Sequence, residues 1–334
     1  MSASPVLILT AAFGDGHNAA ARGLAAAIQL QGGHAVVADP FAESKPALND
    51  FARRLYLSLI NRAPHAWNLF YATCHRLPLI ENSLFVHGAA QRRVEDLLRT
   101  HRPKVVVLTF PVYAHLIARL PKDLRETFQL ITVVTDSISV HRLWSTARAN
   151  LWIVPNEPTA IALAALGIAR EKIQPVGFPV DPRFASPDPH PGDEPPGERP
   201  RILHLLNSGL RGGPELAAAL ASQPGWEVTI GTGRDPKVSQ KVKAGGALTQ
   251  ETIASRTPFL VTQVVPGQEE GNFSLLREIG VARLTPDGDS AVRTIQEALR
   301  ENGKGWKEWK AKLASASKPD ASLRLADLCL SMNR

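Results

Sequence analysis

Short apolar runs alternate with helical segments along the first half of the chain. Several runs are continuous stretches of Val, Ile and Leu, which is typical of strands covered on both faces. The strands predicted in this way are 6–10, 34–39, 104–110, 129–135, 151–155 and 174–176, and helices are predicted at 19–30, 91–100 and 158–166. This alternation predicts a doubly wound α/β domain, whose ligands bind at the carboxyl ends of the strands.

A second alternation follows a proline-rich stretch. Residues 186–200 are too rich in proline and glycine for a helix or an interior strand, so we predict a semi-rigid linker. Beyond it we predict strands at 201–206, 226–231 and 259–265, helices at 214–222 and 306–332, and a helix opened by Gly245 and Gly246. The chain therefore divides into an N-terminal domain (1–185), the linker (186–200) and a C-terminal domain (201–334), and we expect a cleft between the domains.

The bulk composition narrows the class of protein. With 334 residues, 44% of them hydrophobic, the chain is long enough for two domains with full cores. No apolar run approaches the roughly 20 residues of a membrane span, and the first strand begins without a secretion signal. Cys74 and Cys329 are isolated, which suits a reducing compartment, so we expect a cytoplasmic protein. The net charge of +7 allows nucleic acid, an anionic membrane or an anionic substrate as partner.

The first strand leads through a glycine turn into a helix. Gly14, Gly16 and Ala19 fit the pattern GxGxxG/A, and Asp39 ends the second strand about 20 residues later, as in dinucleotide-binding folds. His17 favours a catalytic loop instead, because a histidine there can carry protons and stands where a pyrophosphate would approach. A tight turn capped by the histidine is the third interpretation. This stretch alone leaves all three open.

Asp136 ends an apolar run and so lies at the carboxyl end of a predicted strand. An aspartate there can orient a histidine base or act as the base itself. His141 and Trp144 follow it closely. An ordinary strand-end aspartate is the alternative, since such residues are common in turns.

Two further motifs suit a nucleotide sugar. The turn at Gly245 and Gly246, with Thr249, fits a phosphate at a helix start, and Glu251 is placed to accept a ribose hydroxyl, although capping of that helix is the simpler alternative. The loop at 266–272 gathers Gln268, Glu269 and Asn272, groups that can read sugar hydroxyls. An acidic surface loop is the alternative for these three residues.

Residues 42–86 mix aromatic and basic side chains. Tyr56, Trp67 and Tyr71 are interleaved with arginine and histidine, a combination that suits a surface resting on an anionic bilayer. Two helices packed on the domain are an equal alternative. Nucleic acid is a weaker interpretation, because the chain shows neither a reader motif nor a dense basic run.

Taken together, these residues resemble the family of monogalactosyldiacylglycerol synthases and processive diacylglycerol glucosyltransferases. The segments that carry the resemblance occur in the family's order along most of the chain. They are 14–17, 134–136 with His141 and Trp144, 177–184, 245–249 with Glu251, and 266–269 with Asn272.

The resemblance implies a GT-B fold, in which two Rossmann-like domains face a cleft, and a UDP-sugar held by the C-terminal domain. By resemblance, Gly245, Gly246 and Thr249 hold the diphosphate and Glu251 the ribose. The residues expected to read the sugar are Gln268, Glu269 and Asn272, and those expected to face the nucleotide are Ser208 and Gly209.

The N-terminal domain would then take diacylglycerol. His17 and Asp136 are the acid–base candidates for an inverting transfer of galactose or glucose. The acceptor and membrane surface would comprise Gly14, Gly16, His141, Trp144, Tyr56, Trp67 and Tyr71. The family resemblance also implies an enzyme peripheral on the inner face of the cell membrane, in contact with anionic lipids.

No metal or other cofactor is expected, because backbone N–H groups and a helix dipole can meet the UDP charge. The triplet Asp287-Gly288-Asp289 resembles the metal-binding DxD of some sugar transferases, but it follows Pro286 in a turn-rich stretch, so we predict a plain turn.

One segment departs from the family. Between Gly233 and Gly245 the family has a further helix, strand, helix and strand, whereas this chain has only residues 234–244. Such a stretch is too short for a strand–helix–strand crossover, which needs at least about 10–12 residues beyond its strands. Two alternatives therefore stand beside the transferase: a non-catalytic binder of nucleotide sugar or lipid, and a soluble sugar-nucleotide epimerase of the same architecture. A nicotinamide-dependent dehydrogenase remains the interpretation tied to the first glycine turn.

Overall fold

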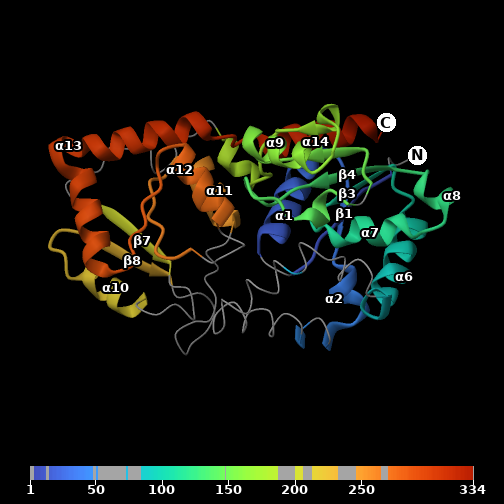
Figure 1. Ribbon diagram of the computed structural model, residues 1–334, viewed down its shortest axis with the longest axis horizontal. Coiled ribbons are helices and arrows are strands. Elements are labelled where there is room, and N and C mark those ends of the chain that lie inside the picture. Colours follow the sequence, from blue (N-terminus) through green and yellow to red (C-terminus); the bar gives the residue numbers. More distant parts are fainter. Residues whose placement is uncertain are drawn as a thin grey trace. The chain divides into compact units, whose positions relative to one another are not determined.

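The computed structural model of the chain forms two units (Figure 1). The first comprises Met1–Ser186 together with Lys318–Arg334, and the second comprises Pro187–Ser317. The residues whose structure is described are 4–12, 15–47, 50–51, 73, 84–146, 148–186, 200–205, 213–231, 246–264 and 270–333. Most of the predicted linker therefore lies outside them.

The first unit is built on a six-stranded parallel sheet of order β2-β1-β3-β4-β5-β6. Its strands are β1 (Val6–Leu9), β2 (Ala35–Ala38), β3 (Val105–Leu108), β4 (Gln129–Val133), β5 (Leu151–Ile153) and β6 (Ile173–Gln174). All six lie within or beside the ranges predicted from the apolar runs. The strand order reverses between β1 and β3, and an open α/β sheet binds its ligands at the carboxyl end of such a switch point.

Helices cover both faces of this sheet. They are α1 (Asp15–Leu30), α2 (Pro40–Ser44), α6 (Leu84–His101), α7 (Val112–Ala118), α8 (Lys122–Arg125), α9 (Glu157–Ala165) and α14 (Ala321–Met332), with 3-10 turns η1 (Arg142–Trp144), η2 (Arg170–Lys172) and η3 (Pro182–Ala185). Alternate residues of β1 enter opposite cores: Leu7 and Leu9 pack with α6 and α7, while Val6 and Ile8 pack with α1 and α14. The doubly wound architecture is thus confirmed for the first unit.

The last helix, α14, packs on the first unit, although we predicted residues 201–334 to form one C-terminal domain. Figure 1 shows it beside α1, and its Leu325 and Cys329 are fully buried in the core that α1 covers. The side chain of Asn333 is hydrogen-bonded to Ser4 near the other end of the chain. The backbone of Gly177 lies against the start of this helix, where an added Cβ would come within 2.6 Å of Ala321 Cβ.

The second unit has a smaller parallel sheet of β7 (Arg201–Leu205) and β8 (Glu227–Gly231). Its helices are α10 (Gly213–Ala221), α11 (Gly246–Ala254), α12 (Glu270–Glu278) and α13 (Gly288–Ala316). The core joins Leu216 and Leu220 of α10 to Val292 of α13, with Ile202 and Val228 of the sheet packed against them. The α/β alternation predicted for this half is therefore present.

Two predicted elements of the second half differ from the structure. In place of the strand predicted at 259–265, the described residues 259–264 contain one isolated parallel bridge, from Val261 to Leu284. The predicted helix 306–332 is divided, because Ser317 leaves the helical region with ψ 134°. In addition, α13 is interrupted at residues 300–303, where Glu301 and Asn302 have positive φ. Among the described helices, none is both long and apolar enough to cross a bilayer.

Candidate active site

The site predicted around His17 lies at the carboxyl edge of the first unit's sheet. Helix α1 begins at Asp15, so Gly16 and His17 form its first turn, four residues earlier than the predicted start at 19. An added Cβ on Gly16 would meet nothing within 4 Å, so close packing does not require glycine there. Gly14 lies outside the described residues.

The ring of His17 is held by its Nδ1 atom. This nitrogen lies 2.6 Å from the carbonyl oxygen of Thr109, after β3, and 3.0 Å from Oγ1 of Thr135, after β4. Since a carbonyl oxygen only accepts, Nδ1 must carry the proton. In the neutral ring, Nε2 then holds the lone pair, and it has no hydrogen-bond partner among the described residues. This arrangement presents an oriented proton acceptor.

Aromatic side chains surround this imidazole. The Phe110 ring meets it edge-on at 5.1 Å between centroids, and the Trp144 ring lies tilted at 6.1 Å. Removal from water disfavours the imidazolium, and burial lowers the pKa of His17 to about 4, although the Thr109 carbonyl opposes the shift. His17 is therefore neutral at pH 7, in the form that can accept a proton.

Asp136 lies three residues after the end of β4 at Val133. Its Oδ2 accepts the Trp144 indole N–H at 2.8 Å and the backbone N–H of His141 at 3.2 Å. Burial raises the pKa of this carboxyl, while the two hydrogen bonds act in the opposite direction. Trp144 thus connects the two acid–base candidates, because its ring contacts His17 and its N–H binds Asp136.

His141 and Trp144 support the site from inside the domain. Both are buried, at 7% and 2% exposed, and the Nδ1 atom of His141 accepts the backbone N–H of Leu143. We predicted both residues for the acceptor and membrane surface. Their burial instead suits side chains that hold Asp136 in place. The other residues predicted for that surface, Tyr56, Trp67 and Tyr71, lie in the part of the chain that is not described.

Asp39, which the dinucleotide interpretation assigns to a ribose, is occupied by protein donors. Its carboxylate accepts the backbone N–H groups of Ala12 and Ala42, each at 3.0 Å, and the hydroxyl of Tyr113 at 3.2 Å. It also caps α2. The carboxylate thus links the end of β2 to the chain after β1, to α2 and to α7. Because its oxygens already accept these protein donors, the structure gives no support to a ribose contact in a nicotinamide site at the first turn.

The second unit places only part of the predicted donor site among the described residues. Helix α11 begins at Gly246, so Thr249 is its fourth residue and not its N-cap, while Glu251 follows half a turn later. Asn272 is the third residue of α12 and is buried, at 7% exposed. Predicted residues beyond the described ranges are Ser208, Gly209, Gly245, Gln268 and Glu269.

The acidic triplet at 287–289, predicted to be a plain turn, instead begins a helix: Asp287 is the N-cap of α13, and Gly288 and Asp289 are its first residues. Asp287 accepts the backbone N–H of Ser290 at 2.7 Å and begins α13 with a capping box. Over the described residues, no three His, Cys, Asp or Glu side chains gather as a metal site would require.

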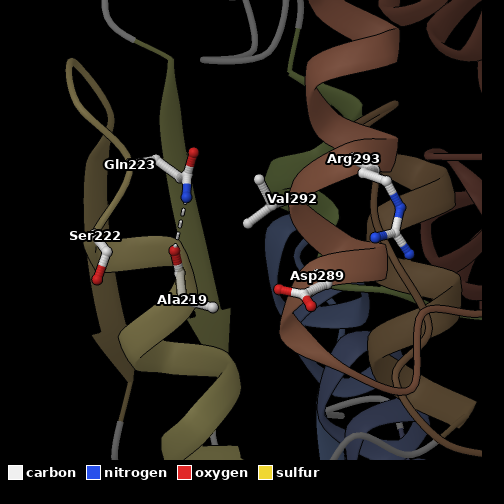
Figure 2. Close-up of a pocket in the computed structure, with 6 residues that line it drawn as sticks. All are labelled: Ala219, Ser222, Gln223, Asp289, Val292 and Arg293. Atoms are coloured by element: carbon white, nitrogen blue, oxygen red, sulfur yellow. Dashed lines mark hydrogen bonds between the residues drawn. The ribbon is translucent and has the colours of Figure 1, made fainter.

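An open pocket of about 250 Å³ lies in the second unit between the end of α10 and the start of α13 (Figure 2). Its lining includes Gln223, whose amide donates to the carbonyl of Ala219 at 3.3 Å, and Asp289 and Arg293 from α13. None of the predicted site residues lines this pocket. We therefore place the candidate site at the carboxyl edge of the first unit's sheet and not in this pocket.

Some supporting residues were missed by sequence reasoning. Thr109 and Phe110 follow β3, as Asp136 follows β4, so the rule that ligands lie at carboxyl strand ends should have singled them out. Thr135 was noted only as part of a motif. Its hydroxyl contact with His17 joins residues 118 positions apart, which no local pattern reveals.

Comparison with known proteins finds a family and near-full-length relatives. The family model for monogalactosyldiacylglycerol (MGDG) synthase matches residues 17–180, a range that begins at His17 and includes Asp136. The processive diacylglycerol beta-glucosyltransferase of Bacillus cytotoxicus is 23% identical over 367 residues, covering 98% of this chain and 94% of that protein. A protein of the same name from Bacillus cereus is 24% identical with the same coverage. The aligned length exceeds the 334 residues of this chain, so the relatives contain residues that it lacks.

Solved structures show the same fold at low sequence identity. The glycosyltransferase of kitacinnamycin matches with a TM-score of 0.59 and 12% identity, covering 100% of both chains. Arabidopsis thaliana UGT89C1 complexed with UDP-L-rhamnose matches with 0.56 and 12%, also covering 100% of both. A putative UDP-N-acetylglucosamine 2-epimerase from Listeria monocytogenes matches with 0.57 and 13%, covering 99% of this chain and 96% of that one. The predicted GT-B fold class is thus confirmed, while fold alone does not separate a transferase from an epimerase.

Proposed function

We propose that this chain, a relative of the monogalactosyldiacylglycerol synthase family, transfers a hexose from a UDP-sugar to diacylglycerol. One observation carries the proposal: His17 is a neutral imidazole whose Nδ1–H is fixed by the Thr109 carbonyl. Its Nε2 is therefore a proton acceptor already oriented at the carboxyl edge of the sheet. The match to the family model begins at this residue.

In the proposed reaction, Nε2 of His17 takes the proton from the diacylglycerol hydroxyl as that oxygen attacks the anomeric carbon. The new glycosidic C–O bond forms while the bond from the anomeric carbon to UDP breaks, so the configuration inverts and UDP leaves with the electron pair. Asp136 then stabilises the imidazolium, because a carboxylate near a cation favours the charged form. A positioned base of this kind typically contributes 10²–10⁴-fold.

The second unit would hold the donor. We assign the diphosphate to the start of α11, where unpaired N–H groups and the helix dipole favour an anion, and we expect no metal. The residues proposed for the donor are Gly245, Gly246 and Thr249 for the diphosphate, Glu251 for the ribose, Ser208 and Gly209 for the nucleotide, and Gln268, Glu269 and Asn272 for the sugar. UDP-glucose is the first donor to test, because the near-full-length relatives are named glucosyltransferases.

The acceptor is a membrane lipid, so the enzyme would work at a bilayer surface. The net charge of +7 favours anionic lipids, and the inner face of the cell membrane is the surface that we propose. Tyr56, Trp67 and Tyr71, with Gly14 and Gly16, remain our candidates for contact with the acceptor and the bilayer.

The test is sugar transfer to lipid. The protein is incubated with radiolabelled UDP-glucose or UDP-galactose and with diacylglycerol in vesicles with and without anionic lipid, and labelled glycolipid is measured. Label in the lipid fraction, stimulated by anionic vesicles, supports the proposal. UDP binding by calorimetry without transfer would support a non-catalytic binder. Epimerisation of a UDP-sugar without lipid would overturn the proposal in favour of an epimerase.

A further inference from the structure

A strained turn follows Asp136. Ile138 has φ +58°, a region that a β-branched residue rarely adopts. The N–H of Ser139 donates to the carbonyl of Ser137 at 2.6 Å, so residues 137–139 form a γ-turn with a positive central φ, the rarer and more strained form. Such strain persists only where surrounding contacts hold it, and it occurs preferentially at functional sites.

Thr159 of α9 supplies the contact that holds this turn. Its side chain is fully buried, and its Oγ1 accepts the backbone N–H of Ile138 at 2.9 Å. The same hydroxyl donates to Oδ1 of Asn156 at 2.7 Å, and Asn156 caps α9 by accepting the N–H of Thr159. The start of α9 and the strained turn are therefore one hydrogen-bonded unit.

The turn reverses the chain so that its next residues reach Asp136. Five residues after the aspartate, the N–H of His141 binds Oδ2, and the indole N–H of Trp144 binds the same oxygen. The far end of the loop is fixed as well, because the indole of Trp152 on β5 donates to the carbonyl of Trp144 at 2.8 Å. The carboxylate thus depends on a loop that is bent at one end and tied to the sheet at the other.

We propose that Thr159 is a positioning residue for Asp136: by accepting the Ile138 N–H, it holds the strained turn that brings the donors of residues 141 and 144 to the carboxylate. The inference rests on the proposed function, since it takes Asp136 as part of the transfer site. Thr159 acts through the loop and is assigned no contact with substrate.

Kinetics with matched variants test this role. Thr159→Val keeps the side-chain shape but removes the acceptor, and we expect kcat to fall roughly tenfold with KM for the UDP-sugar nearly unchanged. Thr159→Ser keeps the hydroxyl and should retain kcat. The control is Thr132→Val in β4, because Thr132 is also buried, at 2% exposed, but its Oγ1 has no partner among the described residues.

The indole N–H signal of Trp144 in a ¹H–¹⁵N NMR spectrum gives a readout that needs no activity. It is assigned among the six tryptophans by its loss in Trp144→Phe. We expect Thr159→Val to shift this signal and both Thr159→Ser and Thr132→Val to leave it in place. If the wild type transfers no sugar, the proposed function fails, and the indole signal still decides whether Thr159 holds the loop.

An active wild type whose kcat is unchanged by Thr159→Val overturns the inference, as does a fall in kcat without movement of the indole signal. If Thr159→Val does not fold, the turn is relieved by adding Ile138→Gly, because glycine adopts positive φ without strain. The double variant should then fold with kcat partly restored. A folded double variant with kcat as low as that of Asp136→Asn would also count against the inference.

Discussion

At the scale of residues, the site combines two groups whose surroundings disfavour charge. Burial lowers the pKa of His17 to about 4 and raises that of Asp136, so both shifts favour the neutral forms. Hydrogen bonds then orient each side chain. The Thr109 carbonyl fixes the tautomer of the imidazole, and the Trp144 indole N–H binds one oxygen of the carboxylate. In the proposed reaction, proton transfer would therefore start from a neutral, oriented base.

Replacing His17 with asparagine tests the roles of its two ring nitrogens separately. The amide of His17→Asn can still donate to the Thr109 carbonyl, as Nδ1 does, but nothing replaces the Nε2 lone pair. We expect kcat to fall by about 100-fold or more with the fold retained, measured by glycolipid formation and circular dichroism. Unchanged turnover would remove His17 from the reaction.

The same residue predicts a pH dependence of stability. The folded-state pKa is about 4 against 6.5 for the unfolded chain. Between these values the unfolded state binds a proton that the folded state does not, so the free energy of unfolding falls as the pH decreases from about 6.5 to 4. This loss amounts to about 3 kcal/mol and is absent from His17→Asn. Urea unfolding of both proteins at pH 7 and pH 4 measures it, and equal pH dependence would contradict the prediction.

Asp136→Asn removes the charge while keeping an oxygen acceptor for the Trp144 indole. Because the imidazolium formed during transfer then lacks its carboxylate, we expect turnover to drop by about 100-fold or more. Asp123→Asn, at an exposed aspartate of α8, is the matched control and should retain full activity. Equal rates in the two variants would show that Asp136 has only a structural part.

At the scale of elements, continuous apolar runs predicted the strands well, because strands between two helical layers are buried on both faces. The start of α1 was predicted too late, since Gly16 and His17 look like turn residues although they form the first helical turn. The predicted strand at 259–265 is not formed over its described residues 259–264, since an apolar run becomes a strand only where it pairs along its length. Within 259–264, Val261 is the one residue that is bridged, to Leu284.

The docking of α14 makes Gly177 sensitive to any side chain. Gly177 has φ +125°, and an added Cβ would lie 2.6 Å from Ala321 Cβ. Gly167 has φ +95° with nothing within 4 Å, so Gly167→Ala carries the backbone strain without the collision. We expect Gly177→Ala to reduce the free energy of unfolding by roughly 2 kcal/mol more than Gly167→Ala does, measured by urea unfolding. Equal losses in the two variants would mean that α14 can move away from the added Cβ without loss of stability.

At the scale of the whole molecule, the chain returns from its second unit to complete the first. Helix α14 covers the face of the sheet on which α1 also packs, and its Leu325, Ala326 and Cys329 are buried there. The first 186 residues therefore lack one wall of their own core. Domain prediction from the linker alone could not detect this return.

Ending the chain at residue 317 should expose that core. We expect the shortened protein to bind the dye ANS and to aggregate, because apolar surface that α14 covers would face water. Leu325→Ala in the full chain is the milder comparison, with a loss of about 2–5 kcal/mol. A monomeric shortened protein with unchanged melting temperature would contradict the packing of α14.

The sequence by itself determined the parallel sheet, the two α/β halves, the family resemblance and the candidates His17 and Asp136, because these depend on local periodicity and on motifs of a few residues. Only the tertiary structure decided which groups surround them. Thr109, Thr135 and Trp144 meet His17 from separate strands and loops, and α14 joins a unit that begins more than 300 residues earlier. Contacts between distant segments follow from how strands order themselves and how apolar faces pair, which no single stretch of sequence encodes.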